Sequence, residues 1–145
     1  MNIDGIQNGY VIDHIRAGKA MTIYRYLGLD KLDCSVAIIK NAKSRRMGRK
    51  DIIKIDELID IDLDVLGYID PDVTVNVIRE NALAEKKHLT LPEHVMAVIR
   101  CKNPRCITQV EQEITHEFVL TDKEHGVYRC IYCETAHKND DRADF

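Results

Sequence analysis

The fold is decided by residues 35–55, which read SVAIIKNAKSRRMGRKDIIKI. The two ends of this stretch, residues 35–39 and 51–55, are rich in β-branched side chains and predict two strands. The polar, basic residues 41–48 between them are expected to form the connecting loop. The fold class follows from what flanks this pair of strands, because a helical segment lies on each side of it in the sequence.

Towards the N-terminus, apolar residues recur at helical spacing between residues 20 and 27, and Gly28 suits the end of a helix. Residues 6–12, before that helix, have the composition of a strand. Towards the C-terminus, Asp62 can cap a short helix that continues to Tyr68. Both segments are short, so their helical character depends on apolar spacing and capping together.

A further strand at residues 73–78 completes the order strand, helix, strand, strand, helix, strand, and residues 83–89 add a trailing strand. That order is the split βαβ arrangement of ferredoxin-like folds. We therefore predict an α+β protein whose N-terminal domain is a ferredoxin-like βαββαβ sandwich. Such a sheet carries helices on one face only, so its other face or its edge is available for pairing or binding.

A second, smaller domain is expected after Leu91-Pro92, where the character of the sequence changes. The predicted domains are residues 1–91 and 92–145. Short strands are predicted in the second domain at residues 95–99, 114–120 and 127–129. This small all-β domain of roughly 50 residues is near the size at which a domain needs stabilisation beyond its own core.

The composition excludes several classes of protein. Of 145 residues, 45% are hydrophobic and 31% charged, which is typical of a folded globular protein. The formal net charge of -3 argues against a general nucleic-acid coat protein. We find no apolar run of about 18 residues that could span a membrane, and residues 1–5 lack the apolar segment of a secretory signal. We expect a cytoplasmic protein that binds neither membranes nor nucleic acid.

Four of the five cysteines lie close together near the C-terminus, as Cys101-Lys-Asn-Pro-Arg-Cys106 and Cys130-Ile-Tyr-Cys133. Two close pairs that each follow a strand can bring four thiolates to one tetrahedral point, the geometry that structural zinc prefers. Because sulfur fills every position, we expect one structural Zn2+ and no catalytic metal. The alternatives are two disulfides, thiols in a core, or His137 in place of one cysteine. The fifth cysteine, Cys34, is expected to be a small core residue within a strand.

Basic side chains gather in the stretch that decides the fold, at Lys40, Lys43, Arg45, Arg46, Arg49 and Lys50. They can form a solvated loop or an anion-binding site. On a strand, Lys54 faces away from Ile53 and Ile55. It could therefore act together with the polar residues Asp13, His14 and Asn76 of other strands, and with the cation of Lys86.

Chemistry on a substrate is not expected. Asp13 and His14 are adjacent on a strand, so they should point to opposite faces and make a poor catalytic pair. The sequence contains no nucleophile elbow, Walker loop or dinucleotide fingerprint.

Four motifs in register are similar to one known family. They are Gly9-Tyr-Val-Ile-Asp-His-Ile15, Met47-Gly-Arg-Lys-Asp-Ile-Ile-Lys-Ile55, Thr74-Val-Asn76 and the paired cysteines. Together they resemble the regulatory chain of aspartate carbamoyltransferase. The resemblance implies a non-catalytic subunit that controls de novo pyrimidine biosynthesis allosterically, with ATP as activator, CTP as inhibitor and UTP assisting in some members. It also implies a homodimer of regulatory chains and a zinc domain that contacts the catalytic chain.

The resemblance further implies which residues surround the nucleotide. The sugar would be contacted by Asp13, the phosphates by Lys54, His14 and Lys86, the base by Ile6 and the backbone of Ile3 and Asp4, and the pocket would be lined by Ile52, Asn76 and Leu83 with Lys50 at its edge. The zinc ligands would be Cys101, Cys106, Cys130 and Cys133.

Two other functions fit parts of the sequence. A zinc-ribbon protein that binds nucleic acid would explain the basic run and the metal module, although the acidic balance and the scarcity of aromatic residues oppose it. A stand-alone ferredoxin-like sensor of small molecules would need no catalytic partner. Salt-dependent binding of nucleic acid would favour the first alternative, and a chain that forms no large complex would favour the second.

Overall fold

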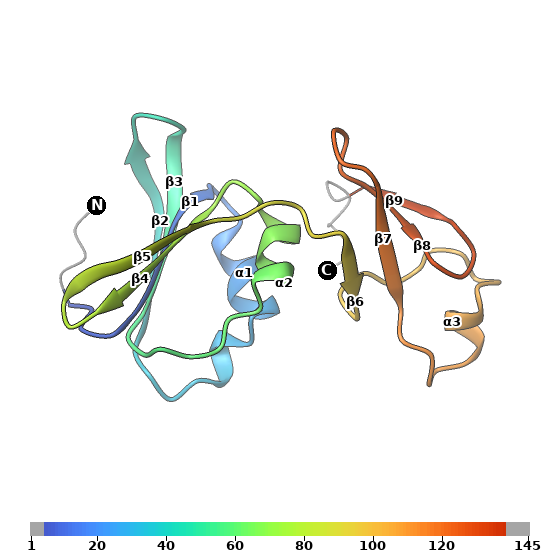
Figure 1. The fold of residues 1–145 in the computed structure, drawn as a ribbon, viewed down its shortest axis with the longest axis horizontal. Helices are drawn as coiled ribbons and strands as arrows, with labels where there is room; N and C mark the ends of the chain where they lie inside the picture. Colours follow the sequence, from blue (N-terminus) through green and yellow to red (C-terminus); the bar gives the residue numbers. More distant parts are fainter. Residues whose placement is uncertain (1–4, 139–145) are drawn as a thin grey trace. The chain divides into compact units, whose positions relative to one another are not determined.

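The computed structural model describes residues 5–138, so Ile3 and Asp4 lie outside the described residues. The chain forms two compact units that divide between Thr90 and Leu91 (Figure 1). No helix within residues 5–138 is long and apolar enough to cross a membrane. Each unit has its own sheet and its own buried residues.

The N-terminal unit is an antiparallel sheet with its two α-helices on one face (Figure 1). Its strands are β1 (Gly9–Arg16), β2 (Val36–Ser44), β3 (Gly48–Ile55), β4 (Thr74–Arg79) and β5 (Ala82–His88), and its helices are α1 (Ala20–Tyr26), the 3-10 helix η1 (Leu29–Lys31) and α2 (Leu63–Ile69). The strands lie in the order β2-β3-β1-β4-β5. Strand β1 is therefore central, and both its neighbours, β3 and β4, pair with it antiparallel. This confirms the predicted α+β fold and the order of its elements.

Apolar side chains of the strands and helices are buried together between the sheet and the helices. Ile12 of β1 pairs with Ile53 of β3 and Val75 of β4, and all three side chains are fully buried. Apolar residues from the helices, Ile23 and Leu66, are fully buried as well. Burying such a side chain contributes roughly 1.5–3 kcal/mol, so this layer stabilises the unit substantially.

Two carboxylates fix how the helices begin. The Asp62 side chain accepts hydrogen bonds from the backbone N–H groups of Asp64 and Val65, both at 3.1 Å, and so caps α2 as predicted. The carboxylate of Asp51 is fully buried in β3 and accepts backbone hydrogen bonds from Gly18, Ala20 and Asn41 at 3.0–3.2 Å. It thereby joins the start of α1, strand β3 and the irregular point of β2.

The predicted loop at residues 41–48 is wrong, because β2 continues to Ser44 and β3 begins at Gly48. Only residues 45–47 form the turn, which the Met47 N–H closes by donating to Ser44 Oγ at 3.1 Å. Strand β2 lies at the edge of the sheet, and none of its residues is fully buried. An edge strand that is exposed to solvent on both faces does not need alternating apolar and polar residues, so its polar sequence resembles that of a loop.

We expect Gly9→Ala to destabilise the N-terminal unit severely. Gly9 lies where β1 passes β3, and a Cβ atom there would lie 1.9 Å from the carbonyl oxygen of Ile55. The backbone must shift to relieve that overlap, at a cost of about 3 kcal/mol or more. Denaturant unfolding measures the loss of stability. Gly28→Ala is the control, because a Cβ atom at that position would contact nothing, although the backbone there has an unfavourable positive φ. The control should cost about 1–2 kcal/mol. Equal losses in the two variants would contradict the steric explanation.

The C-terminal unit is a four-stranded antiparallel sheet in the order β6-β7-β8-β9. Its elements are β6 (His94–Met96), α3 (Ile107–Val110), β7 (Glu117–Asp122), β8 (Val127–Cys130) and β9 (Ala136–Lys138). Its core is small: Phe118 and Tyr128 are fully buried, and the Tyr128 hydroxyl donates to the Pro92 carbonyl at 2.7 Å. Apart from the single turn of α3, the unit is all-β as predicted.

The strand boundaries in this unit differ from the sequence prediction. Strand β6 ends at Met96, because Ala97 has a left-handed φ of 60° and breaks the extended backbone. It therefore does not run into Cys101. Strand β7 begins at Glu117 rather than at residue 114, and neither α3 nor β9 was predicted.

Candidate metal centre and anion-binding face

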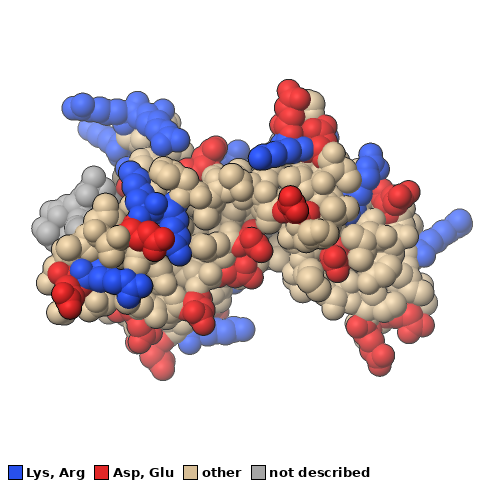
Figure 2. Space-filling model, in the orientation of Figure 1, with Lys and Arg blue, Asp and Glu red and all other residues tan. Residues whose placement is uncertain are grey.

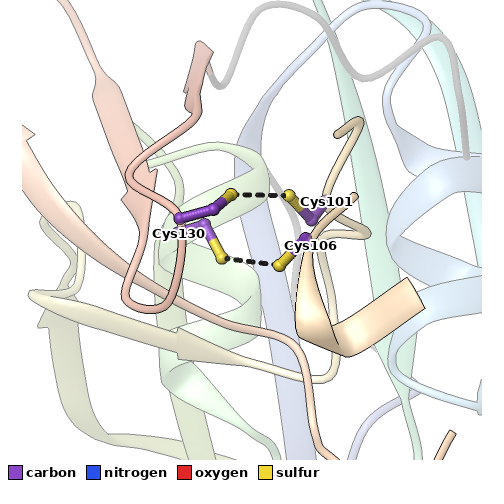
Figure 3. Close-up of side chains that lie close together, drawn as sticks. Cys101, Cys106 and Cys130 are labelled. Carbon is purple, nitrogen blue, oxygen red and sulfur yellow. Dashed lines mark hydrogen bonds between the residues drawn. The ribbon is translucent and has the colours of Figure 1, made fainter. Parts of the chain in front are cut away.

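The four cysteines of the C-terminal unit meet at one point. Cys101 follows β6, Cys106 immediately precedes α3, Cys130 ends β8, and Cys133 lies in the turn before β9. The Sγ atoms of Cys101 and Cys133 are 3.5 Å apart. Those of Cys106 and Cys130, both labelled in Figure 3, are 3.7 Å apart. All four sulfur atoms lie within 4.8 Å of one another. The chain thus folds so that the two segments that carry the cysteine pairs present one sulfur cluster.

The geometry of this cluster fits a tetrahedral metal ion. Zn–S bonds of about 2.3 Å place the sulfur atoms of a tetrahedral site about 3.8 Å apart, close to the separations found. A disulfide would need about 2.05 Å, and within residues 5–138 all five cysteines are free thiols. Burial raises the pKa of the Cys101 and Cys130 thiols, so four thiolates can coexist here only beside a cation.

Hydrogen bonds surround the sulfur cluster. The Thr108 hydroxyl donates to Cys106 Sγ at 3.1 Å, and the Thr135 hydroxyl is hydrogen bonded to Cys133 Sγ at 3.1 Å. The hydrogen bond with Thr135 is the main cause of a lowered pKa for the Cys133 thiol. The environment therefore favours the thiolate at one end of the cluster even before a cation is considered.

Backbone contacts fix the first cysteine of the cluster. The Cys101 N–H donates to His116 Nδ1 at 3.1 Å, and the Gln109 side-chain amide donates to the Cys101 carbonyl. His137 does not belong to the cluster, since its buried ring lies edge-on to Phe118 with ring centroids 6.1 Å apart. The four ligand candidates are therefore the cysteines, and the alternative with His137 is not supported.

In the N-terminal unit, the face of the sheet opposite the helices, which we call the open face, carries a row of polar residues. Register pairs Val11 of β1 with Lys54 of β3 and with Asn76 of β4, and Asn76 in turn with Lys86 of β5. Directly paired residues of antiparallel strands point to the same face. Two lysines and one asparagine, distant in sequence, therefore share one row, and the Asn76 amide is held by donating to the Val11 carbonyl at 3.2 Å.

A second group of charges lies beside that row. Asp13 Oδ1 is 2.9 Å from Lys50 Nζ, and both side chains are mostly buried. Burial alone would raise the pKa of Asp13, but the hydrogen bond from Lys50, the backbone N–H of His14 and nearby positive charge together lower it. The Asp13 carboxylate is thus held ionised.

The expectation that Asp13 and His14 face opposite ways is wrong. Asp13 pairs with Thr74, so these two side chains share a face, and His14 Nδ1 lies 3.2 Å from Thr74 Oγ1. The cause is local: His14 has a left-handed φ of 59°, at a register shift between Ile12 and Ile15. The bulge interrupts the strand alternation and brings the imidazole to the same group of residues as Asp13.

The electrostatic setting of His14 is cationic. Burial lowers the pKa of His14, the charge of Asp13 raises it, and the positive charges of Lys50, Arg46 and Lys86 lower it further. The net shift is downward, so the imidazole is mainly neutral at pH 7. Figure 2 shows the exposed Lys and Arg side chains of the β2–β3 hairpin gathered at one corner of the molecule.

An apolar floor lies next to the charged groups. Ile6, Val11, Ile52 and Ile78 form one buried cluster, against which Ala42 packs. A cleft of about 340 Å³ opens beside it, lined by Gly5, Ile6, Ser35, Val36, Ala37, Lys54 and Asp56. Leu83 pairs with Ile78 at the outer side and is 54% exposed. The residues that the resemblance assigns to a nucleotide therefore share one face of this unit within residues 5–138, and their role stays a prediction.

Sequence reasoning missed several residues of this region. Val36, Ala37 and Asp56 line the cleft, and Thr74 contacts His14, but the sequence assigned none of them a role in a site. The pairing register of the strands brings these residues to the cleft and to His14, and the sequence does not reveal that register. The expectation for Cys34 is also wrong, because it precedes β2 in a bend and is only half-buried.

Comparison with known proteins identifies the family. The family model described as "Aspartate carbamoyltransferase regulatory chain, allosteric domain" matches residues 1–90, and the one described as "Aspartate carbamoyltransferase regulatory chain, metal binding domain" matches residues 93–143. The chain belongs to the aspartate carbamoyltransferase regulatory chain family. It therefore combines an allosteric domain with a metal-binding domain, which confirms the resemblance read from the four motifs.

Members of the aspartate carbamoyltransferase regulatory chain family resemble this chain over nearly its whole length. The one from Clostridium botulinum strain Hall is 50% identical over 141 residues, 97% of each chain. That of Clostridium tetani is 50% identical over 139 residues, covering 95% of this chain and 96% of the relative. That of Bifidobacterium longum is 46% identical over 138 residues, covering 95% and 99%. The sulfur cluster falls within the matched metal-binding domain, and the open face falls within the allosteric domain.

Proposed function

We propose that this chain is a non-catalytic, cytoplasmic regulatory subunit that binds nucleotides on the open face of residues 1–91. The effectors are ATP and CTP, with UTP as a possible third ligand. Residues 92–145, organised by one structural Zn2+, contact the catalytic chain of aspartate carbamoyltransferase. The observation that carries the proposal is the row of Lys54, Asn76 and Lys86 across three strands, next to Asp13 and Lys50.

The phosphates are the part of the ligand that these cations suit. Lys54 and Lys86 lie on either side of Val11 and Asn76 in one row, and no carboxylate belongs to that row. Lysine binds phosphate as a point charge. Asp13 is held ionised and accepts hydrogen bonds, which suits a ribose hydroxyl. Because ATP and CTP share phosphates and ribose, these groups supply affinity for both.

Discrimination between effectors then depends on the base. The cleft beside Ile6 has the volume of a small ligand site, and its lining mixes apolar side chains with Ser35 and Asp56. We assign the base to this cleft, with Ile6 and the backbone of Ile3 and Asp4 near it. Opposite effects of a purine and a pyrimidine nucleotide would then arise from how differently the two bases fill the same space.

Titration calorimetry with ATP, CTP and inorganic tripolyphosphate tests the nucleotide site. We expect each nucleotide to bind one site per chain, the two to compete, and tripolyphosphate to displace both weakly. Binding of nucleic acid in place of nucleotides, with a steep salt dependence, would contradict the proposal.

Nucleotide affinity should strengthen as the pH falls through the range in which His14 titrates. In the free chain the pKa of His14 is below its ordinary 6.5, mainly because of burial, and a bound phosphate would raise it. Binding therefore takes up a proton. Nucleotide affinity should rise roughly 3- to 10-fold as the pH falls from the higher pKa of His14 in the complex to its lower pKa in the free chain. Affinities measured from pH 7.5 down to about pH 5.5 test this. His14→Gln is the control that removes the protein's share and leaves the ligand's own protonation. The same pH dependence in both proteins would contradict the role of His14.

The C-terminal unit offers an apolar surface for a partner. Ile107 and Val110 of α3 are 44% and 67% exposed, and Ile131 and Tyr132 of the Cys130–Cys133 turn are 41% and 48% exposed. These residues belong to the two segments that carry the cysteines, so the metal orders the surface. Exposed apolar side chains of this size are typical of interfaces. We assign the contact with the catalytic chain to this surface.

Native mass spectrometry of the chain mixed with the catalytic chain tests the assembly. We expect a large complex that contains both chains, and a dimer of regulatory chains in the absence of the partner. The edge strand β2, with Ile39 39% exposed, can pair two sheets in that dimer. Val110→Glu should weaken the complex while leaving the dimer intact. A chain that stays monomeric and ignores the catalytic chain would favour a stand-alone sensor instead.

A further inference from the structure

The two threonines beside the sulfur cluster follow one pattern. In each cysteine pair, a threonine lies two residues after the second cysteine, as Cys106-Ile-Thr108 and Cys133-Glu-Thr135. Each threonine oxygen lies 3.1 Å from the sulfur of its cysteine. The same local contact is thus made twice, once on each side of the cluster.

Burial and backbone contacts hold both hydroxyls in place. Thr108 is only 4% exposed, within the single turn of α3, so its hydroxyl needs a partner inside the protein. The Thr135 carbonyl accepts a hydrogen bond from the Cys130 N–H at 3.0 Å, while its hydroxyl contacts Cys133. Thr135 therefore touches both cysteines of its pair, and its position is fixed by the backbone.

We propose that Thr108 and Thr135 are positioning residues of the metal centre, each donating a hydroxyl hydrogen bond to a metal-bound thiolate. The proposal rests on the zinc centre proposed above. A metal-bound thiolate carries no proton, so in that state the hydroxyl must be the donor. Four thiolates and one Zn2+ carry a net charge of about -2, and the two donors stabilise part of it. They also withdraw electron density from the two sulfur atoms, which makes these less reactive towards electrophiles. Because the two hydrogen bonds stabilise the negatively charged centre as a whole, the centre is also less ready to release the ion.

Threonine-to-valine substitutions test this role in the full-length chain, because they remove the hydroxyl and keep the shape. Thr108→Val and Thr135→Val should each lower zinc affinity about 10-fold or more, measured by competition with a chromophoric chelator. Zinc release by N-ethylmaleimide should become faster. Thr108→Ser keeps the hydroxyl and should restore most of the affinity, and Thr115→Val, at an exposed threonine of the same unit, should change nothing.

A spectroscopic signature separates this role from simple packing. In the Co2+-loaded chain, hydrogen bonds to sulfur raise the energy of the sulfur-to-metal charge-transfer band. Each valine variant should therefore shift that band to longer wavelength. If Thr108→Val does not fold, the half-buried Thr135→Val decides the question. An unmoved band and affinities within about two-fold of the wild type would overturn the proposal, whereas a wild-type chain that binds no metal would contradict the zinc centre itself.

Discussion

Replacing Cys106 by alanine is expected to release the metal and unfold the C-terminal unit, while the N-terminal unit stays folded. The structural reason is the small core of this unit, in which Phe118 and Tyr128 are the only aromatic side chains that are fully buried among the described residues. Binding of structural zinc contributes roughly 10–16 kcal/mol in small peptides, which is as large as the whole stability of a typical domain. Zinc content per chain and thermal unfolding followed by circular dichroism measure the effect.

The loss of the metal should also abolish association with the catalytic chain, because the exposed apolar residues lie on the same segments as the cysteines. Cys34→Ala is the matched control, since Cys34 lies in the other unit and outside the cluster. It should retain one zinc per chain and assemble normally. A Cys106→Ala protein that still bound one zinc tightly and formed the full complex would show that the cluster is not required.

Replacing Lys54 by alanine is expected to weaken the binding of both ATP and CTP by about 10- to 100-fold without affecting assembly. A charge-assisted hydrogen bond contributes about 1.5–3 kcal/mol, and Lys54 sits in the middle of the sheet, where it pairs with Val11 and Ala37. Its side chain is not part of the apolar layer beneath the helices, so folding should tolerate the change. Calorimetry gives the affinities, and native mass spectrometry gives the assembly.

The control for Lys54→Ala is Lys43→Ala on the exposed part of the β2–β3 hairpin. It removes the same charge but lies away from the row of Lys54, Asn76 and Lys86, so nucleotide affinity should change less than about 3-fold. If the two variants lowered nucleotide affinity equally, general attraction by the basic hairpin would explain binding better than a defined phosphate contact.

Much of the N-terminal fold could be predicted because its signals are local. β-Branched runs marked the strands, and the Asp62 cap marked the start of α2 at the right residue. The length of β2 could not be predicted, because an edge strand exposes polar residues on both faces. The orientation of His14 could not be predicted either, because a bulge changes the side-chain direction and depends on how β1 pairs with its neighbours.

In the C-terminal unit, the metal site was easier to predict from the sequence than the strands. The spacing of the cysteines predicted their cluster, since two close pairs restrict the possible geometries. The strands around it were harder to place: β6 and β9 have three residues each, too few for a periodic pattern. The single turn of α3 follows directly on Cys106 and has only four residues, too few for a helical pattern to reveal it. Its conformation is set by the need to direct one sulfur towards three others.

The most direct test of the account is the effect of nucleotides on the catalytic chain with and without this chain. The catalytic chain's affinity for aspartate should respond to ATP and CTP only in the complex, by about 5- to 150-fold at most. In a complex built with Lys54→Ala that response should require about 10- to 100-fold more nucleotide, although assembly is complete. A catalytic chain that responds to nucleotides on its own, or a full complex with the unaltered chain that ignores them, would contradict the account.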